Sequence, residues 1–423
     1  MSVRLSEKDQ EMLAGGHGEA AKLAMSILVR MAEVCGAEEM MDVTQAHIDA
    51  CGIMIDSGLE FAETLAGFGG QVCVPTTLNM VPLDLQNWRR LGTPEGFARK
   101  ATRLAKAYTD MGCIPTWTCT PYQGYLTPRY GQQIAWGESN AIVYANSVLG
   151  ARTNRYADFM DICAAITGRV PKSGLHLKAN RKGQLLVRLV DIEPSIMETE
   201  IFYAALGHLV GYLAQDRIPV IEGLPAAASS DQLKAMGAGT ASSGGVGMFH
   251  AIGVTPEANT LEEAFQGDAP EEVVDVRLDD LARARADLST AVEGARLDAV
   301  VLGCPHYSYA QFQRLAEAIR SEEFRAVRPV VRLLAMTSQV AYALLQRSDF
   351  VGTIEEFGVE VVLDTCIMNS PITSPDAKVM MTDSAKWAYY SPGELGIEIA
   401  FGSMRACLRS ATSGFVQREE MSW

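Results

Sequence analysis

Apolar residues along the chain follow two alternating patterns that predict an α/β fold. Short β-branched and apolar runs predict buried strands, and in the last third they recur at 300–302, 330–334, 359–363, 379–381 and 397–400. Between them, apolar residues spaced three and four positions apart predict helices, for example at 309–320. Strands that alternate with helices in this way are typical of a doubly wound sheet.

The earlier part of the chain repeats the pattern less regularly. We predict a strand at 71–74 that runs into a polar, proline-led loop at 75–79, and hairpin-like strands on either side of 180–183. Residues 254–296 are acidic and polar, which predicts a linker into the last unit. We therefore expect three α/β lobes, at 1–155, 156–290 and 291–423.

Composition narrows the class of protein. The 423 residues carry a net charge of −15, which argues against a nucleic-acid partner or an anionic membrane partner, because both require a basic face. Nine cysteines are an odd number spread over a long chain, so they do not form a disulfide framework. No stretch reaches the ~18 apolar residues of a membrane span. We expect a cytoplasmic protein.

Three cysteines stand where predicted strands end. Cys304 follows the run 300–302 and is itself followed by Pro305, which cannot donate to a ladder, so we expect Cys304 on a loop. Cys366 and Cys119 end two further strand-like stretches. Three thiolates could hold an iron–sulfur cluster that leaves one iron open for substrate. Three ordinary buried thiols are the alternative, since free cysteine is among the most buried residue types.

A second polar group occupies an otherwise apolar span at 135–154. Its members are Glu138, Ser139, Asn140, Asn146, Ser147, Arg152 and Asn154. Buried polar groups must be paired, so this concentration predicts either a polar cavity or a set of helix caps with a structural network.

Eight blocks of sequence resemble the aconitase X family, catalytic large-subunit type, in the family's order and along essentially the whole chain. They include Gly303-Cys-Pro-His306, Asp364-Thr-Cys366, Cys119-Thr-Pro-Tyr122 and Asp383-Ser-Ala-Lys386. The resemblance implies an aconitase-like fold, three α/β lobes with mixed or parallel sheets around a central cluster site. It implies Cys119, Cys304 and Cys366 as ligands of an iron–sulfur cluster of 2Fe-2S, 3Fe-4S or 4Fe-4S type.

The same resemblance implies a hydro-lyase that removes water from a small hydroxy acid. Bacterial-type members dehydrate cis-3-hydroxy-L-proline to pyrroline-2-carboxylate, and archaeal members dehydrate 5-phosphomevalonate. We expect the first reaction, because a phosphate substrate should require a second basic cluster and these blocks hold few Lys or Arg residues apart from Arg152 and Lys386. A non-catalytic iron–sulfur or other metal-binding protein would also explain three thiolates, but it leaves the polar span at 138–154 unexplained.

Roles within the site follow from the resemblance and from side-chain chemistry. Arg152 is expected to clamp the substrate carboxylate, because a guanidinium matches a carboxylate bidentately. The other catalytic candidates are Ser147, His306 and Lys386. His306 could orient a water or the leaving group, or it could brace the neighbouring metal ligand. Lys386 is the candidate base, and a plain surface lysine is the alternative. The substrate-binding candidates are Thr76, Thr77, Asn79, Glu138, Ser139, Asn140 and Asn146. The family's swivelling fourth lobe has no counterpart after Trp423, which implies a separate small-subunit partner.

Overall fold

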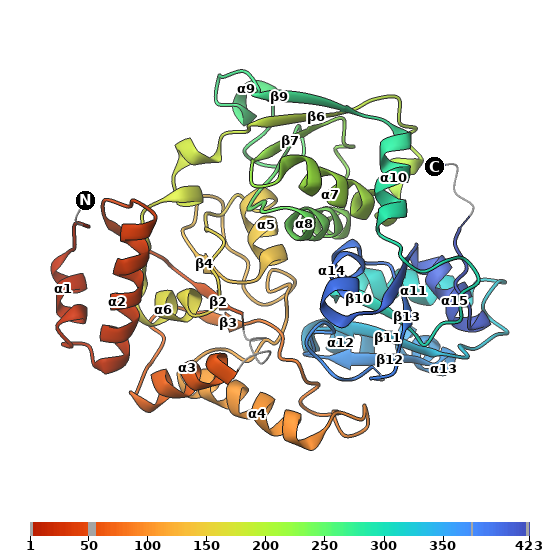
Figure 1. Ribbon diagram of the computed structural model, residues 1–423, viewed down its shortest axis with the longest axis horizontal. Coiled ribbons are helices and arrows are strands. Elements are labelled where there is room, and N and C mark those ends of the chain that lie inside the picture. Colours follow the sequence, from red (N-terminus) through yellow and green to blue (C-terminus); the bar gives the residue numbers. More distant parts are fainter. Residues whose placement is uncertain (1–2, 50–55, 374, 420–422) are drawn as a thin grey trace. The chain divides into compact units, whose positions relative to one another are not determined.

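The computed structural model describes residues 3–49, 56–373, 375–419 and 423 (Figure 1). The chain divides into two compact units, Met1–Lys182 and Gly183–Trp423, and each is described here by itself. The lobe boundaries predicted at 155 and 290 stay predictions. No helix within the described ranges is long and apolar enough to cross a membrane.

The first unit packs helices around two small sheets. Its helices are α1 (Glu7–Leu13), α2 (Glu19–Val34), α3 (Asp56–Gly67), α4 (Glu95–Asp110), α5 (Ser139–Ser147) and α6 (Met160–Thr167). Its strands are β1 (Met40–Asp42), β2 (Ala46–Ile48), β3 (Thr76–Leu78), β4 (Ala135–Trp136) and β5 (Arg169–Pro171). The order β3-β2-β4 is parallel, and β1 pairs antiparallel with β5. Apolar side chains of α2, α4 and α6 form the core.

The second unit begins with a four-stranded parallel sheet of order β8-β7-β6-β9. Its strands are β6 (Leu185–Leu189), β7 (Pro219–Glu222), β8 (His250–Ala251) and β9 (Glu272–Val276). Its helices are α7 (Glu200–Ala214), α8 (Ser230–Ser243), α9 (Leu261–Ala264) and α10 (Leu278–Asp287).

Two predictions for this region are wrong. The stretch 254–296 is not a linker, because it contains α9, β9 and α10. It is acidic because β9 is an edge strand whose exposed carboxylates pair with neighbouring arginines, such as Asp275 with Arg188 at 2.7 Å. The strands around 180–183 do not form a hairpin, because β5 pairs with β1 and β6 belongs to the four-stranded sheet.

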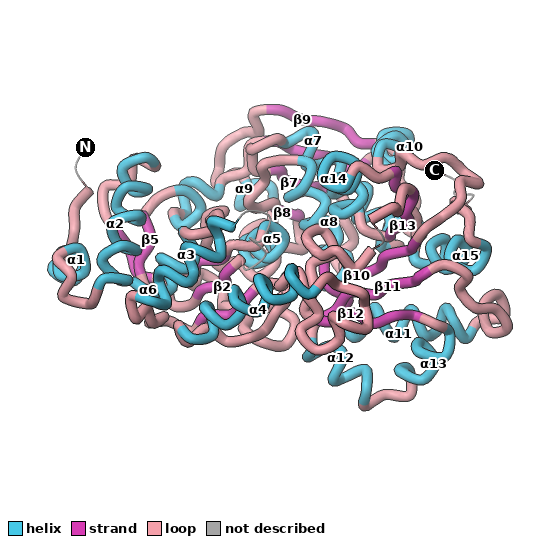
Figure 2. The backbone as a smooth tube through the Cα atoms, turned by 60° about the horizontal axis from the view of Figure 1, so that its bottom comes forward, coloured by secondary structure: helices cyan, strands magenta, loops and turns pink. Residues whose placement is uncertain are grey.

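The second unit ends with the predicted doubly wound sheet, of order β12-β11-β10-β13-β14 and parallel throughout. Its strands are β10 (Ala299–Tyr307), β11 (Arg332–Thr337), β12 (Val359–Leu363), β13 (Val379–Thr382) and β14 (Glu398–Phe401). Its helices are α11 (Tyr309–Arg320), α12 (Gln339–Gln346), α13 (Phe350–Phe357), α14 (Ala385–Leu395) and α15 (Met404–Ser413). Figure 2 shows α11, α12 and α13 together on one side of these strands. The strand order reverses between β10 and β13, so the crevice at their carboxyl ends is the expected ligand position.

Candidate functional site

The end of β10 carries Cys304 on an irregular piece of strand at the carboxyl edge of the five-stranded sheet. Its ladder with β11 stops at Leu302 and resumes at Tyr307. Gly303 has φ 87°, and a Cβ atom there would lie 2.3 Å from the Met336 carbonyl oxygen, so only glycine fits. The prediction of a loop at Cys304 is therefore corrected: the chain continues as a strand with shifted register, and Cys304 is half-buried on it.

Cys366 lies at the same edge of the sheet. It is buried just after β12, and β12 and β10 are the two neighbours of β11. The buried His306 joins the two segments, because its Nε2 atom lies 3.1 Å from the backbone oxygen of Thr365. A carbonyl oxygen only accepts, so Nε2 donates, and the imidazole braces the segments that carry both thiols. A catalytic role for His306 stays a prediction.

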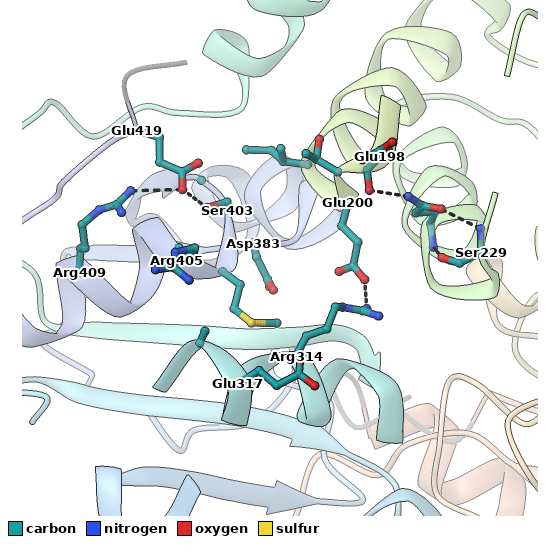
Figure 3. Close-up of a pocket in the computed structure, with 16 residues that line it drawn as sticks. Glu198, Glu200, Ser229, Arg314, Glu317, Asp383, Ser403, Arg405, Arg409 and Glu419 are labelled. Carbon is teal, nitrogen blue, oxygen red and sulfur yellow. Dashed lines mark hydrogen bonds and ion pairs between the residues drawn. The ribbon is translucent and has the colours of Figure 1, made fainter. Parts of the chain in front are cut away.

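A pair of side chains that the sequence did not single out lies at the switch point. The Tyr307 hydroxyl donates to the carboxylate of Asp383, the residue that follows β13. Burial raises the pKa of Asp383 to about 7. Asp383 and Glu200 line a cavity of about 800 Å³ (Figure 3), and they also line a smaller pocket that Cys304 reaches. Asp383 is the first residue of the block 383–386. Its place between the end of a predicted strand and the serine that caps the next helix is the sequence feature that could have identified it.

The arginines of the larger cavity are already compensated by carboxylates. Arg314 pairs with Glu200, and Arg409 pairs with Glu419 at 3.2 Å (Figure 3). Arg405 lies 2.6 Å from the carboxylate of Glu323. Because each of these cations has an acidic partner, the cavity offers a mixed rather than a positive lining.

In the first unit, the residues predicted as a polar loop at 75–79 include a buried strand. Thr76 and Thr77 belong to β3, and both side chains are buried. The Thr76 hydroxyl donates to the Val74 carbonyl at 2.8 Å, and the Thr77 hydroxyl lies 2.8 Å from Nδ1 of His47. Burial lowers the pKa of His47 to about 4, so the imidazole is neutral near pH 7. These contacts explain how a polar sequence forms an interior strand.

Two of the predicted substrate-binding amides present buried oxygens. Asn79 donates through Nδ2 to Asp49 at 2.8 Å, and Asn140 donates through Nδ2 to the Tyr122 hydroxyl at 3.2 Å. The Oδ1 atoms of Asn79 and Asn140 are buried and have no hydrogen-bond partner among the described residues. Buried acceptors of this kind require a donor, so these oxygens fit a polar ligand.

Three other members of the polar span have structural contacts. Glu138 is the N-cap of α5 and accepts from the Ala141 N–H at 2.6 Å, and the Ser139 hydroxyl donates to the same carboxylate at 3.3 Å. Asn146 bonds both backbone groups of Thr153, at 2.9 and 3.0 Å. Caps and a structural network were the alternative explanation of this span, and these contacts match it for part of the span. The predicted substrate contacts of these residues stay predictions.

Arg152 differs from the other arginines described above. Its Nε atom is buried, and within the described part of the chain neither a hydrogen-bond partner for that atom nor an ion pair for the side chain is found. Its charge contributes, after burial and Arg181, to lowering the pKa of His176 to about 3. An uncompensated guanidinium is suited to bind a carboxylate. Ser147 is buried at the end of α5, and Lys386 is half-buried in the first turn of α14.

The thiols divide into two groups. Cys113, Cys163 and Cys407 are buried, and burial raises their pKa, which is typical of inert structural thiols, whereas Cys35 and Cys73 are exposed. Cys304 and Cys366 share one sheet edge, and Cys119 is buried in the first unit. Within the described parts of either unit, no group of three or more His, Cys, Asp or Glu side chains could hold a metal ion. Two thiols at one edge fit part of a thiolate site, and the three-thiolate site stays a prediction.

Comparison with known proteins identifies the class. The structure resembles the crystal structure of Thermococcus kodakaraensis aconitase X in its holo form, with a TM-score of 0.87 and 29% identity over 97% of this chain and 100% of that chain. The fold is therefore the aconitase-like α/β fold. Models of the aconitase X first, second and third domains match residues 2–179, 183–286 and 297–413. The chain belongs to the aconitase X family.

The curated relatives are dehydratases. Cis-3-hydroxy-L-proline dehydratase of Pseudomonas aeruginosa is 44% identical over 97% of this chain and 70% of its own length, and that of Hypocrea jecorina is 42% identical over 98% and 70%. The phosphomevalonate dehydratase large subunit of Methanothermobacter thermautotrophicus is 37% identical over 96% of this chain and 98% of its own length. The predicted hydro-lyase class is thereby confirmed.

Proposed function

We propose that this chain is the catalytic chain of an iron–sulfur-dependent dehydratase that converts cis-3-hydroxy-L-proline to pyrroline-2-carboxylate. The observation that carries the proposal is the identity of 42–44% to two cis-3-hydroxy-L-proline dehydratases over nearly the whole chain, against 37% to the phosphomevalonate dehydratase large subunit named above. Dehydration of 5-phosphomevalonate is the second candidate. The ion-paired arginines of the 800 Å³ cavity support the first, since the described residues that line it form no uncompensated positive cluster for a phosphate.

The roles of this chain's residues follow from the chemistry of the substrate. Cys119, Cys304 and Cys366 would hold the cluster, which when bound supplies an open iron as a Lewis acid for the departing hydroxyl. Arg152 binds the carboxylate in a fork, because among the described residues its buried Nε atom has no hydrogen-bond partner and its side chain no ion pair. Lys386 takes the proton from the carbon next to that carboxylate. The oxygens of Asn79 and Asn140 accept from the substrate's ammonium group.

We further propose that a small subunit completes the enzyme. Archaeal relatives matched along 97–99% of their length are named large subunits, whereas the cis-3-hydroxy-L-proline dehydratases extend beyond the matched 70%. A partner chain would exclude water from the site, which strengthens the electrostatic interactions that bind the carboxylate.

The experiment is anaerobic purification of this chain alone and with the unmatched segment of the Pseudomonas relative supplied as a separate polypeptide. Both samples are assayed with cis-3-hydroxy-L-proline and with 5-phosphomevalonate, and their iron content and absorption spectra are recorded. We expect turnover of cis-3-hydroxy-L-proline only when both chains are present. Turnover of 5-phosphomevalonate but not of cis-3-hydroxy-L-proline would favour the second candidate function. Full turnover by this chain without the added polypeptide would contradict the need for a partner subunit.

A further inference from the structure

Side chains donate hydrogen bonds to the end of β10, where the ladder with β11 is interrupted between Leu302 and Tyr307. Three side chains on three different elements donate to its carbonyl oxygens: Ser384 to Cys304, Lys234 to His306 at 3.1 Å, and Thr337 to Tyr307 at 2.8 Å. Buried carbonyl groups that leave a ladder need such partners. The conformation of the segment that presents Cys304 is thus set by residues that are distant in sequence.

Lys234 is the most unusual of the three donors. It lies on α8 with 1% of its side chain exposed, where an ammonium group is costly unless every charge and donor is matched. Nζ lies 2.5 Å from Oε1 of Gln311 and 3.1 Å from Oδ1 of Asp231, in addition to the His306 carbonyl. An ammonium group has three N–H donors, and these three contacts use all of them. Lys234 therefore has no donor left for a substrate and acts on the strand end.

Ser384 uses one hydroxyl for two purposes. It is the N-cap of α14, where its Oγ atom accepts from the Trp387 N–H at 3.0 Å. The same hydroxyl donates to the Cys304 carbonyl. The start of α14 and the Cys304 peptide are consequently fixed to each other at the switch point between β13 and β10.

We propose that Lys234 and Ser384 are positioning residues that hold the end of β10 in the conformation that presents the Cys304 thiol beside the Cys366 segment. The importance of this arrangement for iron rests on the function proposed above, in which Cys304 is a ligand. The arrangement of the metal-free chain does not rest on it. A thiol held in place before metal arrives loses less conformational freedom on binding.

The test measures the thiol directly in metal-free protein. Iodoacetamide labelling of each cysteine is followed over time by peptide mass spectrometry in wild type, Ser384→Ala, Ser384→Thr and Lys234→Met. Ser403→Ala is the matched control: Ser403 caps α15 by accepting from the Ala406 N–H at 3.2 Å and bonds Glu419, but it does not bond Cys304. Iron per chain after anaerobic reconstitution is the second measurement.

We expect Cys304 to be labelled at least about fivefold faster in Ser384→Ala and in Lys234→Met than in Ser403→Ala. The lost donor leaves a carbonyl oxygen at the end of β10 unpaired, which destabilises that segment and exposes the thiol more often. Labelling of Cys163 and Cys407 should not change. Ser384→Thr keeps a hydroxyl and should restore the wild-type rate. Equal rates in Ser384→Ala and Ser403→Ala would overturn the proposal, and this comparison decides even if Lys234→Met does not fold. If wild type binds no iron while the labelling differences remain, the proposed function fails and the positioning role stands.

Discussion

Replacing Asp383 with asparagine should remove a pH-dependent loss of stability from the folded protein. Burial raises the pKa of Asp383 from 3.8 to about 7, so between these values the folded state holds a proton that the unfolded chain has released. The stabilisation that Asp383 contributes to the folded state is fully present below pH 3.8 and is lost as the pH rises from there through about 7. The complete shift corresponds to a ceiling of ~4 kcal/mol. Because Asp383 lines a cavity, solvent screening reduces the expected difference to ~2 kcal/mol.

Asparagine at position 383 keeps the hydrogen bond from Tyr307 but has no ionisable group. Its side-chain oxygen can still accept from Tyr307, so the variant should gain stability relative to wild type as the pH rises from about 4 to about 7, and the difference should level off above pH 7. Urea unfolding of the metal-free proteins at several pH values measures the difference from midpoint and slope. Asp216→Asn, at an exposed position, is the control and should show no such trend. A stability difference between Asp383→Asn and wild type that is constant across pH would refute the reasoning.

Further expectations concern both units. Arg152→Lys keeps the charge but loses the bidentate geometry, so kcat/KM should fall at least about tenfold (~1.4 kcal/mol) with iron content unchanged. Cys304→Ser should instead lower the iron bound per chain. Normal kinetics for Arg152→Lys would show that Arg152 has a structural role and does not bind the substrate. Burial lowers the pKa of His47 from 6.5 to about 4, so stability should fall by up to ~3 kcal/mol as the pH drops through that range, and His47→Gln should flatten this fall in acid titrations followed by circular dichroism. Asp9→Asn removes the buried partner of Arg169 at 2.8 Å and should cost ~3 kcal/mol, measured by thermal unfolding; a loss below ~1 kcal/mol would contradict it.

The strands that could be predicted from the sequence are those that are buried on both faces of their sheet. Strands β10 to β14 lie in a parallel sheet whose strands are largely covered by helices, so they read as continuous apolar runs, and the predicted run at 359–363 coincides with β12. β9 was missed because an edge strand with charged, exposed side chains has the composition of a linker. β3 was mistaken for a loop because its threonines satisfy their hydroxyls inside the protein, and hydropathy alone does not register a paired polar group.

In the candidate site, features set by neighbouring residues could be predicted from the sequence, and contacts between distant residues could not. The apolar run at 300–302 correctly predicted a strand that reaches Cys304, whereas Pro305 wrongly predicted that the strand stops there, because β10 continues to Tyr307. The partner of the adjacent His306 carbonyl is Lys234, 72 positions away, and a lysine in a helix gives no local sign that it is buried. An apolar side chain of similar size is often as stabilising as a buried, paired charge, so stability alone does not explain Lys234. Its contacts with the His306 carbonyl and Gln311 support the proposed role in positioning the end of β10.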